Sequence, residues 1–573
     1  MTPPPAPARL AALLGGLPAS GEPRLGRLLG GMLWRQRRRT LPALAAAAAL
    51  SILAFLPPWL VAGLIDEGFI GREAGLVAGI ASLIFVLGAV DGGLAYVRRL
   101  LAAQATLALR RELLLPAFGT MLRLPADSGL ARDQGVLGRA FEEVDRLAQG
   151  AGDRLTEFAL GVGTVIILLG AMLTVDWRIG LAAGALVAAL AGLHLAAAAS
   201  LRRREASWFE ARSRYWGHLI EAVAYIETLR RNSAHAFAER RFRERLDQDS
   251  ASHLSVVRLS AGLDAAGRFA GGAIIAAVTL LAGWSVMSGQ ASVGGFVLLL
   301  SLGGALTAPA LSVLKVVDDL QAMIVATVCL RRLATPPHEA VDWTSTSREA
   351  AAEALAICDL TFSYGPQEQP VIDRLSFTLA PGETLALLGR SGVGKSTLAN
   401  LLIRARQGEG EIRLGDRRSA EVPLGAWRRR IVVVPHEIDI FTGSIAENIA
   451  LPKPDAGREE VAMAATLAGL ADDIAGLPDG YDTRLGQDGV ELSAGQKQRL
   501  GLARAMFFTP DVLILDESTS ALDPATERRV LDTLLQRHAG AAVLAITHRD
   551  SVAARMDRIL RLDDEPVVEG QAA

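Results

Sequence analysis

Apolar residues gather in long runs in the first part of the chain, before about Val328. Six of these runs reach the roughly 20 residues that a helix needs to cross the hydrocarbon core of a bilayer. The pattern therefore predicts six membrane-spanning helices. We place them near 41–64, 75–97, 156–175, 178–200, 267–287 and 292–314.

The charged segments between these runs predict how the chain crosses the membrane. Residues 98–155 and 201–260 are rich in arginine, and loops rich in Lys and Arg stay on the cytoplasmic side. Residues 24–39 mix arginines with Leu, Met and Trp34, as in a helix that lies on the membrane surface. We expect a multi-pass protein of the cytoplasmic (inner) membrane, with both termini and two long helical extensions in the cytoplasm.

The end of the chain has a different pattern. Short apolar runs without alternation are typical of strands that are buried on both faces of a largely parallel sheet. They occur at 355–357, 385–388, 431–434, 512–515 and 542–546. We expect an α/β domain over 353–573, after a linker at 334–352, a transmembrane domain at 24–333 and a flexible tail at 1–23. The fold class is thus an all-α six-helix transmembrane domain with long intracellular helical extensions, fused to an α/β domain.

Charge excludes one class of partner. The chain has 573 residues, of which 51% are hydrophobic, and its net charge is only −2. Proteins that bind nucleic acids usually present a strongly basic surface. We therefore expect no nucleic-acid partner.

A glycine-rich loop predicts the chemistry of the α/β domain. The segment G-R-S-G-V-G-K-S-T at 389–397 fits the phosphate-binding pattern G-x-x-x-x-G-K-[ST], and it lies between an apolar strand and a helix. Its backbone N–H groups and the helix N-terminus favour phosphate oxygens. Lys395 offers a positive charge to the β- and γ-phosphates, and Ser396 a hydroxyl to Mg²⁺. The candidate residues are Gly389, Arg390, Ser391, Gly392, Val393, Gly394, Lys395, Ser396 and Thr397.

Two more segments complete the candidate nucleotide site. The strand at 512–515 ends in Asp516 and Glu517. A carboxylate at such a strand end can hold Mg²⁺, and the next one is placed to polarise an attacking water. The segment Leu492–Gln496 opens a helix with Ser and Gly, which is a second anion-binding element.

These motifs together resemble the ABC transporter family, and the resemblance covers nearly the whole chain. The family signature L-S-G-G-Q stands here as LSAGQ, with Ser493, Ala494, Gly495 and Gln496. Asp523 matches the D-loop, His548 the switch histidine that contacts the γ-phosphate, and Tyr364 the aromatic residue that stacks on adenine. With six spans before them, the chain resembles a half-transporter of the exporter type.

The resemblance implies ATP and Mg²⁺ as cofactors, and ATP hydrolysis coupled to transport. In the family, the signature segment of one subunit closes over the phosphate loop of the other. We therefore expect a second half-transporter subunit, in a homodimer rather than a heterodimer. The resemblance also places coupling helices near 124–138 and 215–224, at the tips of the two extensions.

Three positions depart from the family pattern. His436 stands where the Q-loop glutamine is expected. The resemblance therefore makes it a candidate catalytic residue, with Glu517 and His548, and a candidate Mg²⁺ ligand, with Ser396 and Asp516. Gln487 replaces a glutamate, and Ala494 replaces a glycine of the signature. The departures allow two interpretations, tolerated variation or altered coupling. The intact Lys395 and Glu517 favour an active ATPase.

The spans say little about the cargo. The ionisable residues in or near them are Asp91, His194, Asp264 and Arg268, and the last two are spaced to form a pair. Such groups face a cavity or one another. We expect export or flipping of an amphipathic cargo, such as a lipid, a drug or a modified peptide, with membrane lipid as a partner. The alternatives are import of a siderophore-like molecule by an exporter fold, and an ATP-gated channel or regulator.

Overall fold

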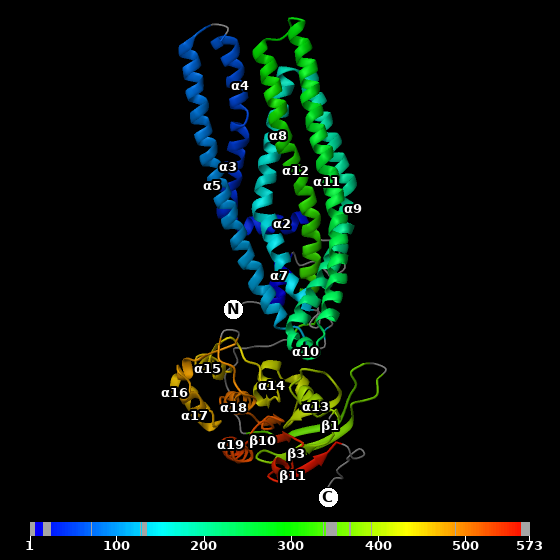
Figure 1. The fold of residues 1–573 in the computed structure, drawn as a ribbon, viewed down its shortest axis with the longest axis vertical. Coiled ribbons are helices and arrows are strands. Elements are labelled where there is room, and N and C mark those ends of the chain that lie inside the picture. Colours follow the sequence, from blue (N-terminus) through cyan, green and yellow to red (C-terminus); the bar gives the residue numbers. More distant parts are fainter. Residues whose placement is uncertain are drawn as a thin grey trace. The chain divides into compact units, whose positions relative to one another are not determined.

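The computed structural model describes residues 6–14, 25–69, 72–125, 128, 134–335, 337–339, 352–365, 368–390, 392–486 and 489–562. The described residues form two units, which meet in sequence between His338 and Glu339. We call the first the helical unit and the second the α/β unit. Figure 1 shows both.

Long helices make up the helical unit, and six helical stretches of it are long and apolar enough to cross a membrane. Five of them contain a predicted span in full and the sixth begins one residue after its predicted start, so this part of the fold class is confirmed. The stretches are Arg37–Phe69, Ala74–Met121, Ala140–Val175, Trp177–Ala224, His235–Met287 and Val293–Val316. The helices are α1 (Ala6–Leu13), α2 (Leu25–Arg35), α3 (Arg37–Leu53), α4 (Leu56–Gly63), a π-helical turn (Leu64–Phe69), α5 (Ala74–Met121), α7 (Gln134–Gln149), a second π-helical turn (Gly150–Arg154), α8 (Leu155–Val175), α9 (Trp177–Ala224), α10 (Ile226–Arg231), α11 (His235–Met287) and α12 (Val293–Ala334).

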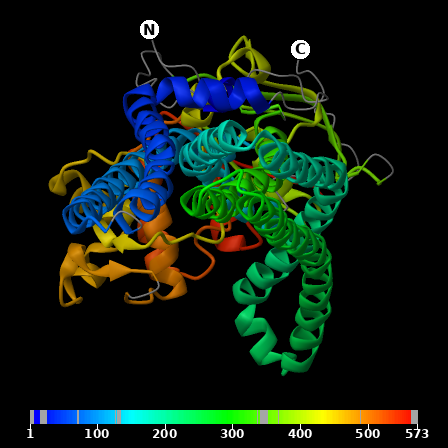
Figure 2. The same ribbon diagram turned by 90° about the horizontal axis from the view of Figure 1, so that it is seen from above.

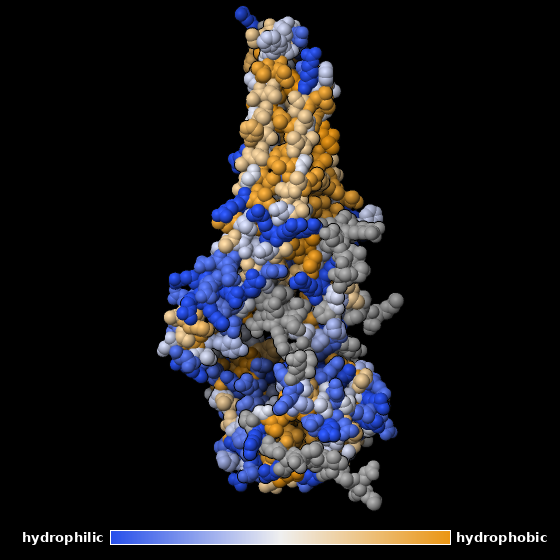
Figure 3. All heavy atoms as spheres, turned by 90° about the vertical axis from the view of Figure 1, so that its right-hand side faces the viewer, coloured by the Kyte–Doolittle hydropathy of each residue, from blue (hydrophilic) through white to orange (hydrophobic). Residues whose placement is uncertain are grey.

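Small residues allow the long helices to approach closely, as is usual between membrane helices. A methyl group added at Gly271 of α11 would overlap the side chain of Thr307 on α12. Apolar side chains of α8, α9, α11 and α12, among them Leu168, Ile179 and Leu302, form one buried cluster around this contact. On the face formed by α9 and α11, Figure 3 shows high-hydropathy side chains over much of the bundle.

The first helix corrects the expectation of a flexible tail over 1–23. Residues Ala6–Leu13 form α1, and Leu10 is fully buried. Leu10 and Leu14 belong to the same apolar cluster as Leu109 and Leu113 of α5. Burial of these leucines stabilises the segment, a gain that its Pro/Ala-rich composition does not reveal. The other residues of 1–23 lie outside the described ranges. The next helix, α2, lies across the long helices (Figure 1).

The tip of the second extension lies further along the chain than predicted. Residues 215–224 belong to the last turns of α9, and the short separate helix is α10, Ile226–Arg231. Figure 2 shows this end of the α9–α11 pair projecting from the bundle. The helix pattern continues without a break to Ala224, so the sequence carries no signal for an earlier turn. Most of the predicted tip at 124–138 lies outside the described residues or has no described side chains.

The α/β unit contains a five-stranded parallel sheet in the order β11-β3-β10-β9-β6. A four-stranded sheet, β2-β1-β4-β5, and the pair β7-β8 complete the strands. The strands are β1 (Leu355–Phe362), β2 (Ile372–Leu379), β3 (Thr384–Leu388), β4 (Glu409–Leu414), β5 (Arg417–Arg418), β6 (Ile431–Val434), β7 (Gly443–Ser444), β8 (Arg484–Leu485), β9 (Val512–Asp516), β10 (Ala542–Ile546) and β11 (Arg558–Arg561). The α-helices are α13 (Lys395–Leu402), α14 (Leu424–Arg430), α15 (Ile445–Ile449), α16 (Arg458–Leu467), α17 (Ala471–Ala475), α18 (Ala494–Ala505), α19 (Pro524–Arg537) and α20 (Asp550–Ala553), and single 3₁₀ turns lie at Ser419–Glu421 and Gly480–Asp482.

Four of the five predicted strands lie in the parallel sheet, and one does not. β1 pairs antiparallel with both β2 and β4. Its first residues form a short apolar run like the others, so periodicity alone does not distinguish it. The expectation of a parallel strand at 355–357 was therefore wrong.

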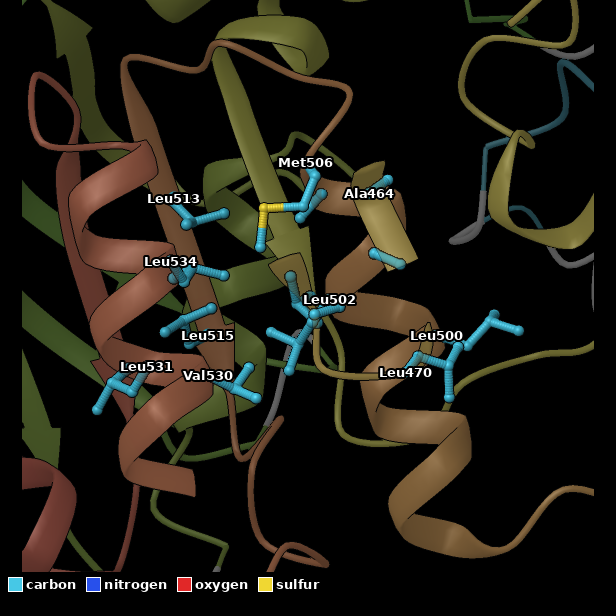
Figure 4. Close-up of a cluster of buried hydrophobic side chains, with 14 of the residues drawn as sticks. Ala464, Leu470, Leu500, Leu502, Met506, Leu513, Leu515, Val530, Leu531 and Leu534 are labelled. Carbon is cyan, nitrogen blue, oxygen red and sulfur yellow. The ribbon is translucent and has the colours of Figure 1, made fainter. Parts of the chain in front are cut away.

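Both faces of the parallel sheet are covered, which explains why its strands are apolar throughout. Alternate residues of β9, such as Leu513 and Leu515, pack against α16, α18 and α19 (Figure 4). Their neighbours Val512 and Ile514 join the cluster that includes α13, α14 and the antiparallel sheet. The loops that follow β3, β6, β9 and β10 lie at the carboxyl edge of the sheet.

Candidate functional site

The predicted site residues follow the carboxyl ends of neighbouring parallel strands. The glycine-rich loop comes after β3, His436 after β6, Glu517 after β9 and His548 after β10. In open α/β sheets, ligands bind in the crevice outside these ends. Four segments that are far apart in sequence therefore meet at one edge.

The glycine-rich loop is closed around the ammonium group of Lys395. Its Nζ donates to the backbone oxygens of Gly389 at 2.6 Å and Arg390 at 2.9 Å, and the side chain is buried. Gly394 has a φ of +107°, a conformation that L side chains rarely adopt. A methyl group at Gly394 would also lie 2.9 Å from Val371. The loop thus depends on glycine, and it places a cation among its backbone groups.

Ser396 and Asp516 form the candidate metal position. The Ser396 hydroxyl donates a hydrogen bond to the Asp516 carboxylate, which is buried at the end of β9. Burial raises the pKa of Asp516, while Ser396 and the charge of Lys395 lower it. A hydroxyl and a carboxylate suit Mg²⁺, which binds few protein oxygens and completes its shell with water and phosphates. Among the described residues, no group of three or more His, Cys, Asp or Glu could hold a metal.

Two of the three residues predicted to be catalytic, Glu517 and His548, lie together. His548 Nδ1 is 3.3 Å from Glu517 Oε1, and the imidazole is exposed. Glu517 has a φ of +48°, in the left-handed region that non-glycine residues avoid. Its backbone N–H donates to Ile546 and its backbone oxygen accepts from Gln498, and these bonds help to hold the strained turn. Such strain costs on the order of 1–3 kcal/mol and is commonly found at active sites.

His436 reaches the same turn from the neighbouring strand. Its Nδ1 lies 3.3 Å from the Ser520 hydroxyl and 3.4 Å from the backbone oxygen of Glu517. Its imidazole is one of the groups that lower the pKa of Asp516. The structure therefore brings the unusual Q-loop residue beside the acidic pair, as the sequence predicted.

Tyr364 lies next to the phosphate loop with half of its surface exposed. Its hydroxyl is 2.8 Å from that of Thr397, which lies in the first turn of α13. The guanidinium of Arg406 lies 4.7 Å from the centre of the Tyr364 ring. An aromatic face fixed beside the loop is suited to stacking on a base, and Arg406, which sequence reasoning missed, adds a cation to it.

The signature segment caps its own helix. Ser493 accepts a hydrogen bond from the backbone of Gln496, and the Gln496 side chain accepts one from the backbone of Ser493. This capping box fixes the start of α18. Ser493 and Ala494 are exposed. An open helix start with free N–H groups is available to an anion from outside the chain.

Sequence reasoning missed the residues that hold the D-loop. Gln498 of α18 is buried, donates to Ser520 at 2.9 Å and accepts from the backbone of Ala521 at 2.8 Å. Arg549 donates to the backbone oxygen of Ser520 at 2.8 Å and to the buried Glu527 at 2.6 Å. Little signal was present, because Gln498 stands between the charged residues Lys497 and Arg499 in the sequence.

The remaining predicted site residues have mixed outcomes. Asp523 accepts hydrogen bonds from Ala525 and Thr526 and so caps α19. Gly392 and Val393 lie in the phosphate loop and Gly495 lies in the first turn of α18, while Ser391 and Gln487 lie outside the described residues.

In the helical unit, the predicted ionisable residues do not form one site. Asp264 faces Lys315, with 3.9 Å between the charged atoms, so the expected pair with Arg268 is absent. The i, i+4 spacing of Asp264 and Arg268 concerns α11 alone, so it could not reveal Lys315 of α12. His194 is buried and its Nδ1 is 3.1 Å from the Leu190 oxygen of its own helix. Asp91 lines a cavity of about 780 Å³.

Comparisons with known proteins agree with this geometry. A family model described as ABC transporter matches residues 372–520, and one described as ABC transporter transmembrane region matches residues 41–310. A Thiobacillus denitrificans protein named ATP-dependent lipid A-core flippase is 30% identical over 95% of this chain and 94% of its own length. The chain belongs to the ABC transporter family. As an ABC transporter, it couples ATP hydrolysis to transport through its membrane spans.

Other relatives of this ABC transporter are similar in sequence and fold. A Pseudomonas fluorescens protein with the same flippase name is 30% identical over 87% of this chain and 83% of its own length. A solved structure of a bacterial Atm1-family ABC exporter with ATP bound has a TM-score of 0.80 and 25% identity, and covers 93% of this chain and 94% of that chain. The arrangement is thus that of an exporter with six spans and one nucleotide-binding domain per chain. Exporters of this half-transporter kind act as dimers.

Proposed function

We propose that this transporter flips an amphipathic lipid across the cytoplasmic membrane and uses ATP to drive the step. The observation that carries the proposal is the 30% identity, over 95% of the chain, to a protein named ATP-dependent lipid A-core flippase. The cavity of about 780 Å³ supports it, because its walls combine apolar residues such as Leu50 and Leu160 with charged residues such as Arg98. Such walls suit a molecule with an apolar and a polar end.

The geometry at the sheet edge supports the following roles in ATP hydrolysis. Lys395 binds the β- and γ-phosphates, and Ser396 and Asp516 hold Mg²⁺, which neutralises charge on the phosphate oxygens. Glu517 polarises the attacking water, and His548, at 3.3 Å from it, contacts the γ-phosphate and keeps the carboxylate oriented. His436 contacts the same centre in place of glutamine. Tyr364 stacks on adenine.

The complete site is formed by two subunits. Within one chain, Ser493 and Gln496 form the capping box at the start of α18. Ser493 and Ala494 nevertheless remain exposed. We assign the Ser493 segment to the ATP bound at Lys395 of a second copy of this chain. Closure of the two copies around ATP shifts the equilibrium between the two orientations of the cavity, because ATP binds the closed state more tightly.

The membrane location completes the proposal. The transporter resides in the cytoplasmic membrane, with both termini and the α/β unit in the cytoplasm. The arginine-rich segments 98–155 and 201–260 support this orientation through the positive-inside rule.

A vesicle assay tests the proposed function. The full-length protein is placed in proteoliposomes with the α/β unit outside, and a fluorescent phospholipid is added to the outer leaflet. With ATP and Mg²⁺ in the outer buffer, the fraction of lipid protected from dithionite rises. An unchanged protected fraction at full ATPase activity contradicts lipid flipping, and an ATP-dependent fall indicates transport in the opposite direction.

A further inference from the structure

Two cavities in the helical unit share a group of charged residues. One, of about 780 Å³, is lined by residues of α3, α5, α8 and α12. The other, of about 640 Å³, is lined by residues of α5, α8 and the segment before α8. Arg98, Arg99 and Glu157 line both. These charges therefore lie where the two cavities adjoin, at the end of the second predicted span.

Arg98 is the unusual member of this group. Its residue is only 6% exposed. Its Nε and Nη1 atoms are buried and have no hydrogen-bond partner among the described residues. A buried guanidinium without a partner is costly, because it loses its hydration and gains no compensating contact. Ionisable groups of this kind within a span usually mark a ligand path.

The nearby carboxylates do not neutralise Arg98. Glu157 is engaged by Arg154 at 3.4 Å, and Arg154 also faces Asp319 at 3.3 Å. Asp91 lies seven residues before Arg98 on α5, which is about 10 Å along a helix axis. Arg99 lies beside Arg98 and adds a second positive charge to the cavity walls. The three charged residues common to both cavities thus carry two positive charges and one negative charge, while Asp91 lines only the larger cavity and Asp153 and Arg154 line only the smaller one.

We propose that Arg98, assisted by Arg99, binds the phosphate group of a ligand in these cavities. Guanidinium groups match phosphate oxygens in shape and charge, and such hydrogen bonds are among the strongest in proteins. The apolar wall formed by Leu50, Ala54 and Leu160 lies in the same cavity and would cover acyl chains. The inference deepens the proposed function, on which it rests, by assigning a phosphate-bearing headgroup to the cargo. A free phosphate ester has the same headgroup chemistry.

Binding to the full-length protein in dodecyl maltoside tests the site with three probes. Phosphatidate carries both phosphate and chains, diacylglycerol of the same chain composition lacks the phosphate, and glycerol 3-phosphate lacks the chains. Native mass spectrometry titrations give a dissociation constant for each. We expect phosphatidate to bind about 10- to 100-fold more tightly than diacylglycerol, the range for hydrogen bonds to a charged group. Equal binding of these two lipids would overturn the proposal.

Variants separate Arg98 from general effects on the protein. Arg98→Gln should remove the preference for phosphatidate, while Arg98→Lys should keep part of it because the charge remains. Arg178→Gln is the matched control, since Arg178 is exposed and stacks on Trp177 away from both cavities. If Arg98→Gln elutes as aggregate, the Arg98→Lys protein decides: full retention of the wild-type affinity contradicts a bidentate contact.

The remaining outcomes distinguish a lipid phosphate from a soluble phosphate ester. They also distinguish failure of the Arg98 site from failure of the proposed lipid flipping. Arg98-dependent binding of phosphatidate but not of glycerol 3-phosphate supports a lipid ligand, and equal binding of both supports the site with a soluble ester. An Arg98→Gln protein that still prefers phosphatidate refutes the site, even where vesicles show lipid flipping. Arg98-dependent binding without flipping in vesicles leaves the site standing and contradicts the proposed function instead.

Discussion

The imidazole Nδ1 of His548 lies 3.3 Å from Oε1 of Glu517, at the ends of the adjacent strands β10 and β9. Glu517 is held in a left-handed turn with a φ of +48°. A carboxylate in this strained turn, in contact with an exposed histidine, is placed to act on the phosphate side of the sheet edge. The relationship leads directly to the first prediction.

The change Glu517→Gln should nearly abolish ATP hydrolysis while ATP still binds. The amide keeps the size of the side chain, but it cannot accept a proton from the attacking water, so turnover should fall by about 100-fold or more. The loop around Lys395 is untouched, so the dissociation constant for ATP should stay within about threefold of wild type. Phosphate release and binding of a fluorescent ATP analogue measure the two quantities. Wild-type turnover in the variant would show that Glu517 is not the catalytic carboxylate.

The Arg549–Glu527 contact should be a major source of stability in the α/β unit. Glu527 is buried, and Arg549 Nη1 donates to it at 2.6 Å. Loss of the cation in Arg549→Met leaves a buried carboxylate unpaired, which costs about 3 kcal/mol. Urea unfolding of the full-length protein, followed by proteolysis of the unfolded α/β unit, measures the loss.

Two further variants control this stability prediction. Arg528→Ala removes an exposed arginine of α19 and should change the unfolding free energy by less than about 0.5 kcal/mol. Adding Glu527→Gln to Arg549→Met should recover part of the loss, because the unpaired charge is gone. Equal effects of Arg549→Met and Arg528→Ala would contradict the importance of the buried pair.

His538 should make the α/β unit less stable in mild acid. The side chain is buried at the end of α19, and burial lowers the pKa of His538 from 6.5 to about 4. Between these two values the unfolded chain binds the proton and the folded chain does not, so the unfolding free energy falls as pH decreases from 6.5 towards 4. The expected loss is about 2 kcal/mol between pH 7.5 and pH 5.

Replacement of the histidine isolates this contribution. In His538→Phe the ring is retained without a titrating group, so urea unfolding at pH 5 and pH 7.5 should differ by about 2 kcal/mol less than in wild type. Above pH 7 the two proteins should show the same slope of stability against pH. The same acid sensitivity in both proteins would show that His538 is protonated in the folded state.

Cross-linking tests the arrangement of the signature segment. One subunit carries Arg390→Cys and its partner Ser493→Cys, in a background of Cys329→Ala and Cys358→Ser, since neither natural cysteine forms a disulfide within the described chain and each could react with the reagent. A short bifunctional maleimide should join the two chains, and more so with ATP, because the Ser493 segment closes over the loop that holds Lys395. Chains that carry both new cysteines but cross-link only internally would contradict a site made by two subunits.

The sequence predicted the spans and the phosphate loop because both depend on local pattern. A run of about 20 apolar residues, or the glycine-rich loop around Lys395, can be recognised from one continuous stretch of sequence. Features that depend on distant packing were missed or wrong. α1 is ordered by the burial of Leu10, β1 is antiparallel through its partners, and Asp264 faces Lys315 of another helix. Arg98 was missed for the same reason, since its burial is a property of four helices together.

The most direct test of the account is to measure ATP hydrolysis and lipid movement in the same proteoliposomes. Wild type and Glu517→Gln are compared with a fluorescent phospholipid in the leaflet that faces the α/β unit. The account predicts that wild type hydrolyses ATP and protects the lipid from dithionite, and that both rates fall together, by about 100-fold or more, in Glu517→Gln. Lipid movement that continues at the wild-type rate in Glu517→Gln would contradict the claim that ATP hydrolysis at this site drives the flipping of lipid.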